Sequence, residues 1–237
     1  MQSNTLLILI AFFGMTTLVC LVLLGLAIAN SNDANVRQRT LLIMAGVFAW
    51  TGLQGILSFS DFYAANLDAM PPRLVLFGIA PMLVLIIGLF LSAQGQVFID
   101  SLPLNLLTYI HIVRIPVEIA LLLLARKGFI PDIMTFEGRN YDIVAGITAP
   151  LVAYFGITKG HMNKTMLIGW NLICLALLMN IVVMGVLSAP LPFQQMAFEQ
   201  PNVAVLIFPF SWLPTVIVPI VLFSHLVSLR QIMKRDL

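Results

Sequence analysis

Charge is scarce in this 237-residue chain. Only 9% of its residues are Asp, Glu, Lys or Arg, whereas 60% are hydrophobic. So few charged residues cannot cover the surface of a water-soluble globule of this length. The formal net charge is only +2 and its basic residues are spread over several loops, so no nucleic acid partner is expected. The composition predicts an integral membrane protein whose main partner is the lipid bilayer.

Cysteine and recognisable catalytic motifs are also scarce. Cys20 and Cys174, the two cysteines, lie in apolar runs, where buried thiols are expected and a structural disulfide is not. The chain has no glycine-rich phosphate loop, no H-E-x-x-H pattern and no paired Cys or His motif. No catalytic residue is identified, an enzyme is the less favoured interpretation, and any metal site stays unknown.

Long apolar runs are abundant. A transmembrane helix needs about 20 predominantly apolar residues to cross a hydrocarbon layer about 30 Å thick. We count seven such runs, which predict an all-α, polytopic membrane protein built as a seven-transmembrane-helix bundle in a single transmembrane domain, residues 1–237. The predicted spans are 5–29, 41–59, 74–93, 104–125, 143–158, 166–187 and 203–229. The fifth span is short and contains Pro150.

The basic residues of the loops predict the orientation, because Lys and Arg are retained on the cytoplasmic side. An N-out/C-in arrangement puts seven basic residues inside and four outside. The inner set is Arg37, Arg39, Lys159, Lys164, Arg230, Lys234 and Arg235, and the outer set is Arg73, Arg126, Lys127 and Arg139. The default location is a bacterial inner membrane.

The fourth predicted span carries the most informative residues of the chain. His111, Arg114 and Glu118 are three and four residues apart, so they share one helical face, with Tyr109 near its cytoplasmic end. A charged side chain at bilayer depth costs roughly 2.5 to 3.5 kcal/mol on insertion scales. We therefore expect this polar stripe to face protein, with Arg114 and Glu118 as an intramembrane charge pair.

Two interpretations of the stripe stay open. Arg114 and Glu118 either pair only to fix helix packing, or they line a cavity that binds or conducts a small polar solute or proton. In the second case Arg114 holds an anionic group, Glu118 takes up a proton or a cation, and His111 and His225 tune the site near the inner face.

Two further functions are alternatives. His111 in the fourth span and His225 in the seventh lie at similar depths, as axial ligands of a b-type haem would. The protein is otherwise a non-catalytic membrane subunit or scaffold, in which the stripe is dry and fully paired.

The seventh span and two outer loops are the remaining unusual segments. Prolines recur at positions 209, 214 and 219, which predicts a kinked seventh helix. Outer-loop residues that suit a hard cation or a substrate are Glu137, Arg139, Asp142 and Glu199. The loop from Ser188 to Asn202 is either an ordinary interfacial segment or a lid over a cavity that reaches Glu118.

Overall fold

The structure, a computed structural model, describes residues 2–234. Arg235, one of the basic residues counted for the orientation, lies outside this range. All regular secondary structure within the range is helical. The elements are α1 (Gln2–Ala29), α2 (Ala34–Gln38), α3 (Thr40–Phe59), η1 (Val75–Ile79), α4 (Ala80–Leu91), α5 (Ala93–Ser101), α6 (Leu104–Ile110), η2 (His111–Val113), α7 (Arg114–Ala125), η3 (Asp132–Met134), α8 (Ile143–Leu151), η4 (Val152–Thr158), α9 (Lys164–Ser188), η5 (Ala204–Leu206), η6 (Leu213–Ile217) and α10 (Val218–Lys234).

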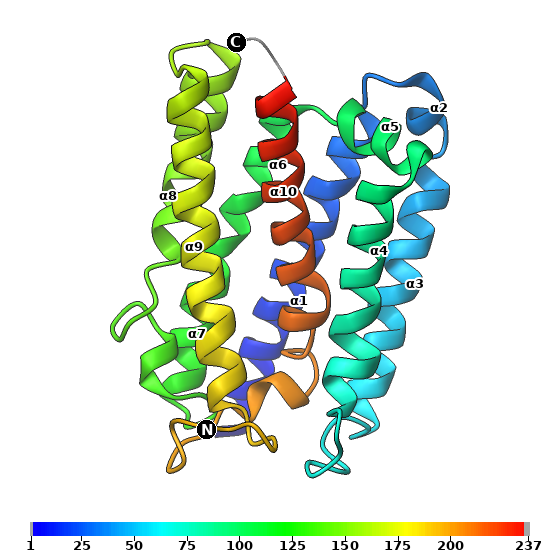
Figure 1. Cartoon of the computed structure of the whole chain (residues 1–237). Coiled ribbons are helices and arrows are strands. Elements are labelled where there is room, and N and C mark those ends of the chain that lie inside the picture. Colours follow the sequence, from blue (N-terminus) through cyan, green and yellow to red (C-terminus); the bar gives the residue numbers. More distant parts are fainter. Residues whose placement is uncertain (1, 235–237) are drawn as a thin grey trace.

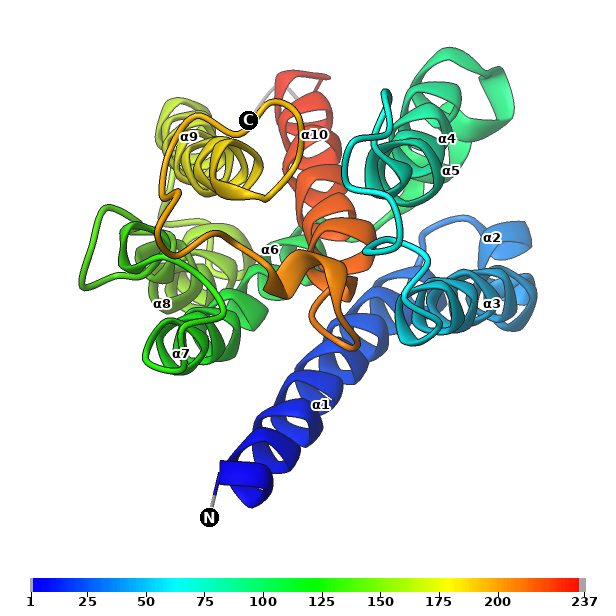
Figure 2. The ribbon, with the colours of Figure 1, turned by 90° about the horizontal axis from the view of Figure 1, so that it is seen from below.

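The long helices stand side by side and alternate in direction (Figure 1). Seen from below, α1 runs obliquely between two groups of helices, one formed by α7, α8 and α9 and the other by α3, α4 and α5 (Figure 2). Helix α10 lies between the same two groups. The chain therefore forms a helical bundle with α10 and the C-terminal part of α1 toward its middle, and the N-terminal part of α1 projects beyond the other helices (Figure 2).

Among the described residues, five helices are long and apolar enough to cross a membrane. They are Thr5–Ala29, Thr40–Phe59, Leu104–Ala125, Lys164–Ser188 and Leu213–Lys234. The pair 75–91 and 93–101 adds a sixth if it is one broken span, and Ile143–Thr158 is a shorter apolar helix. A membrane helical bundle is therefore supported, whereas length and composition do not establish the predicted count of seven.

The third predicted span, residues 74–93, ends in a sharp turn that the sequence did not reveal. The chain bends by 93° between Leu91 and Ala93, and Ser92 caps the new helix α5 by accepting a hydrogen bond from the main chain of Gly95. Asp100 on α5 accepts hydrogen bonds from Arg230 at 2.8 and 3.1 Å. Helix α5 is thereby tied to the end of α10.

The seventh predicted span starts ten residues later than expected. Its helix begins at Leu213 rather than at Val203, and it opens with a π-helical turn, Leu213–Ile217. Pro209 lacks the N–H that a continuous helix would need, whereas Pro214 is tolerated in the first turn, where that N–H has no partner. The prolines predicted an irregular seventh helix, and the irregularity is its late start and its π-helical first turn.

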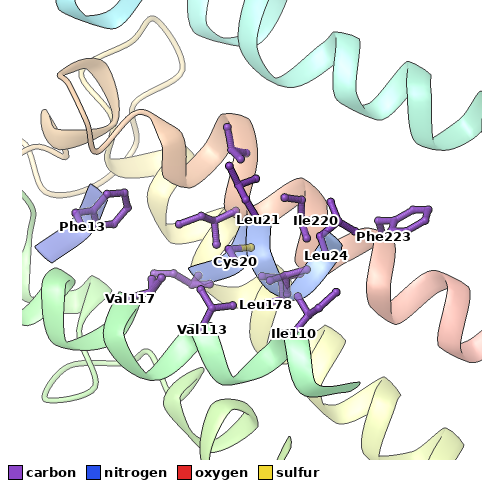
Figure 3. Packing of buried hydrophobic residues seen from close by; sticks show 14 of the residues in the cluster. Phe13, Cys20, Leu21, Leu24, Ile110, Val113, Val117, Leu178, Ile220 and Phe223 are labelled. Carbon is purple, nitrogen blue, oxygen red and sulfur yellow. The ribbon is translucent and has the colours of Figure 1, made fainter. Parts of the chain in front are cut away.

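The main hydrophobic core joins α1 to α6, α7, α9 and α10. Both cysteines are free and buried, as expected. The apolar side chains of this core pack against one another. The polar stripe of His111, Arg114 and Glu118 then faces other parts of the protein. Figure 3 shows part of this cluster, with Phe13, Cys20, Leu21, Leu24, Ile110, Val113, Val117, Leu178, Ile220 and Phe223.

Helices α7 and α8 are in close contact at Gly146. A Cβ atom at this position would lie 2.8 Å from Cγ1 and 3.0 Å from the main-chain nitrogen of Ile115. A contact with main chain cannot be relieved by a side-chain rotation. Gly146 therefore allows the start of α8 to reach the polar face of α7.

We predict that Gly146→Ala destabilises the bundle, because the added methyl group overpacks the α7–α8 contact by about 1 to 3 kcal/mol. The measurement is the apparent melting temperature of purified protein in detergent. Gly169→Ala on α9 is the control, since its Cβ would meet nothing within 4 Å. Equal melting temperatures for the two variants would contradict the close approach.

Candidate functional site

Arg114 is the centre of a buried polar network. Its Nη1 donates hydrogen bonds to Oδ1 of Asp142 at 2.9 Å and to the main-chain oxygen of Cys174 at 3.1 Å. Its Nη2 lies 2.9 Å from Nε2 of His225. Only 2% of Arg114 is exposed. One guanidinium thus joins α7 to the start of α8, to α9 and to α10.

The predicted pair of Arg114 with Glu118 is wrong. The counter-charge is Asp142, which is 28 positions further along the chain and lies immediately before α8. The close packing of α7 against α8 at Gly146 brings Asp142 to the guanidinium, so the closer sequence neighbour Glu118 is left for another partner. The prediction used the spacing of residues within one helix. That spacing carries no information about a contact with a residue outside the helix.

The contact with Arg114 determines the tautomer of His225. A guanidinium donates hydrogen bonds and cannot accept them, so Nε2 of His225 is the acceptor. The ring hydrogen then lies on Nδ1, which donates to Oδ1 of Asn171 at 3.0 Å. His225 is therefore a neutral member of the network and extends it from Arg114 to Asn171.

The two histidines do not fit the haem alternative. The rings of His111 and His225 are stacked, with centroids 3.8 Å apart and planes inclined by 21°. Axial ligands instead point their nitrogens at the iron from opposite faces of a porphyrin. Both histidines are fully buried, and no porphyrin fits between rings in contact. The geometry therefore contradicts their assignment as a haem pair.

Glu118 is held through an amide that the sequence analysis did not single out. Asn140 donates from Nδ2 to Oε1 of Glu118 at 2.6 Å and to the main-chain oxygen of Met134 at 3.1 Å. Oδ1 of Asn140 accepts from the main-chain nitrogen of Asp142. The second carboxylate oxygen of Glu118, Oε2, is buried without a hydrogen-bond partner. Asn140 thus positions both acids of the site.

A cavity of about 120 Å³ opens beside this network, between α7, α9, η6 and α10, with η1 on its far side. Its wall is mostly apolar, and its polar residues are Arg114, Glu118, Asp142 and Asn202. Nε of Arg114, Oε2 of Glu118 and Oδ1 of Asn202 are all buried without a partner. Because each such atom costs roughly 1 to 3 kcal/mol, a ligand or water that satisfies them would bind here favourably.

The loop from Ser188 to Asn202 forms part of the wall of this cavity. Ala189, Leu191 and Phe193 contribute to the wall together with Asn202. Asn202 is fixed by a hydrogen bond from its Nδ2 to the main-chain oxygen of Gly185 at 3.1 Å. Of the two interpretations of this loop, the structure favours the one in which it lies over a cavity that reaches Glu118.

The other candidate residues do not join the site. Tyr109 is half-buried and outside the cavity wall, and Glu199 is exposed. Glu137 forms an exposed ion pair with Arg126, and the exposed Arg139 accepts a hydrogen bond from Asn180 only through its main chain. Of the four outer-loop candidates, Asp142 alone reaches the network. Within residues 2–234, no group of three or more His, Cys, Asp or Glu side chains is placed to hold a metal ion.

We predict that Asp142→Asn lowers the free energy of unfolding by about 3 to 5 kcal/mol, because it leaves the buried guanidinium without its counter-charge. Glu137→Gln, which breaks the exposed ion pair, should cost less than about 1 kcal/mol. Denaturation of both variants in the same detergent checks the difference. A similar decrease in the free energy of unfolding in both variants would show that the network does not depend on Asp142.

Comparison with known proteins gives a family. Residues 71–233 match the family model described as Domain of unknown function (DUF8737). This region begins just before η1, extends through most of α10, and includes every residue of the polar network and the cavity wall. No curated protein and no solved structure matches the chain. Since the match covers well over half of its length, the chain belongs to the family of proteins with this domain of unknown function.

Proposed function

We propose that this integral membrane protein binds a small molecule with an apolar body and one polar head group in the cavity between α7, α9 and α10. One observation carries the proposal. Three buried polar atoms, on Arg114, Glu118 and Asn202, lack partners and belong to residues of one otherwise apolar wall. Ligand pockets combine an apolar lining with a few convergent polar groups in this way.

The size of the cavity limits the ligand. A cavity of about 150 Å³ lined by apolar side chains binds benzene in another protein. By the same proportion, a cavity of about 120 Å³ takes about five non-hydrogen atoms. A body of about four carbons with a single head group satisfies both the volume and the mostly apolar wall.

This proposal revises the predicted ligand. The sequence suggested a small polar solute or a proton, whereas the wall around Glu118 favours an amphipathic molecule. Conduction of a proton or a solute stays a prediction. The scaffold alternative would gain support from a fully paired stripe, and the unpartnered atoms of Arg114 and Glu118 do not give it that support.

We also propose that the broken pair 75–101 and the short helix 143–158 cross the membrane, which makes seven spans. Figure 1 supports this because both stand alongside the longer helices. The loop before α3, the loop before α9 and the end of α10 lie at one end of the bundle. Those segments carry the six described basic residues assigned to the cytoplasm, which supports the N-out/C-in orientation.

The orientation predicts which engineered cysteines react in intact cells. A membrane-impermeant maleimide should label Glu199→Cys in an outer loop and should label His161→Cys only after the cells are broken. Both native residues are exposed, and the native cysteines are buried. The opposite pattern would invert the orientation.

Binding is tested with butylamine, butanol and butyrate, which share a four-carbon body. At least one of these probes should raise the apparent melting temperature of the purified protein, because binding to the folded state stabilises it. Gly185→Leu should abolish that rise, since Gly185 lines the cavity and an added Cβ there meets only ordinary contacts.

Gly169→Leu on the same helix is the matched control and should keep the response, because Gly169 lies outside the cavity and has space around it. The proposal fails if no probe changes the melting temperature, or if Gly185→Leu and wild type respond equally.

A further inference from the structure

We infer that the head group of the ligand is a protonated amine that donates hydrogen bonds to Glu118 and Asn202. This inference rests on the proposed function and specifies the chemical class of its ligand. It follows from the charges around the cavity and from the direction of the hydrogen bonds that the wall leaves unmade.

The ionisable residues of the cavity wall are two acids and one base. Asp142 lies 2.9 Å from Arg114 and compensates its charge. The remaining acid, Glu118, is 1% exposed and has only the neutral amide of Asn140 as its hydrogen-bond partner. A buried carboxyl without a cation loses its charge by taking up a proton. A cationic ligand would supply the compensating charge and hold Glu118 in its ionised, acceptor form.

Two of the three unmade hydrogen bonds of the wall favour a donor, and the third belongs to Nε of Arg114, which is itself a donor. Oδ1 of Asn202 and the ionised form of Glu118 Oε2 are acceptors, and both atoms are buried without a partner. The orientation of the Asn202 amide is fixed, because its Nδ2 faces the main-chain oxygen of Gly185, which can only accept. An ammonium group has three hydrogens to donate and no lone pair to leave unsatisfied.

These two acceptors belong to one contiguous region of the fold. Asn140 contacts both Glu118 and the main chain of Met134, and the side chain of Met134 reaches the neighbourhood of Gly185, beside Asn202. The acceptors therefore lie toward the outer-loop side of the cavity, where Asn202 closes it. At the other polar residue, Arg114, the two terminal nitrogens are engaged by Asp142, His225 and the main chain of Cys174, and Nε is left without a partner.

Other head groups fit less well. A carboxylate would lie beside Glu118 and Asp142. The cavity would then hold three acidic groups and only one base, Arg114. A hydroxyl could donate one hydrogen bond but would leave Glu118 without a compensating charge. A protonated amine differs from the carboxylate and the hydroxyl because it can donate more than one hydrogen bond and carries a positive charge.

The test compares the affinities of butylamine, butanol and butyrate for the full-length protein at neutral pH, by isothermal titration calorimetry in detergent. Butylamine should bind at least about tenfold more tightly than either of the others, since a buried hydrogen bond to a charged group is worth about one to two powers of ten in affinity. This comparison uses the wild-type protein, so it does not depend on the folding of any variant.

Glu118→Gln should weaken butylamine binding by about tenfold or more and leave butanol binding nearly unchanged, because the amide keeps the shape and loses the charge. Glu137→Gln is the control for removal of an acid and should change neither affinity, because Glu137 is exposed and outside the cavity.

The outcomes separate this inference from the proposed function. If butanol or butyrate binds as tightly as butylamine and Gly185→Leu blocks them, the cavity binds amphipathic molecules and the amine inference is overturned. If none of the three binds, both are overturned. Equal loss of butylamine and butanol in Glu118→Gln also argues against a charge-specific contact.

Discussion

The buried contact between Arg114 and Asp142 is the constraint on which the rest of this site depends. A guanidinium inside a membrane bundle has to be matched in charge and in hydrogen bonds, because the surrounding lipid offers neither. Asp142, Cys174 and His225 meet that demand from three different elements. The relative positions of α7, α8, α9 and α10 are therefore coupled to one side chain, and the close approach at Gly146 makes that coupling possible.

The proposed function follows from what this network leaves unsatisfied. With Asp142 engaged, Glu118 is a second acid without a base, and Asn202 adds an acceptor at the covering loop. Buried polar atoms of this kind are rare in native proteins, and each calls for an explanation such as a bound ligand or water. Because these two atoms and an apolar wall belong to the same cavity, a small amphipathic ligand explains them together.

The sequence predicted the polar stripe correctly but not its partners. His111, Arg114 and Glu118 are buried on one side of the fourth helical segment, as their spacing indicated. Their contacts involve residues 22 to 114 positions away, and helical periodicity carries no information on such contacts. Asn140 and Asn202 were missed for the same reason, since an isolated asparagine in a loop has no distinctive pattern. The third span was predicted to end at residue 93, but the turn into α5 was missed because hydropathy marks the end of a span and not the direction of the chain after it.

The sequence by itself determined the class of this protein, because apolar runs of sufficient length and scarce charge require a helical bundle in lipid whatever the arrangement of its helices. It also determined that charged residues in the fourth helix must face protein. Only the tertiary structure decided that Arg114 pairs with Asp142, that the histidines stack instead of facing a haem, and that Glu118 borders a cavity under an outer loop. The physical reason is that burial depends on local composition, whereas ion pairing and cavity shape depend on how separate helices meet.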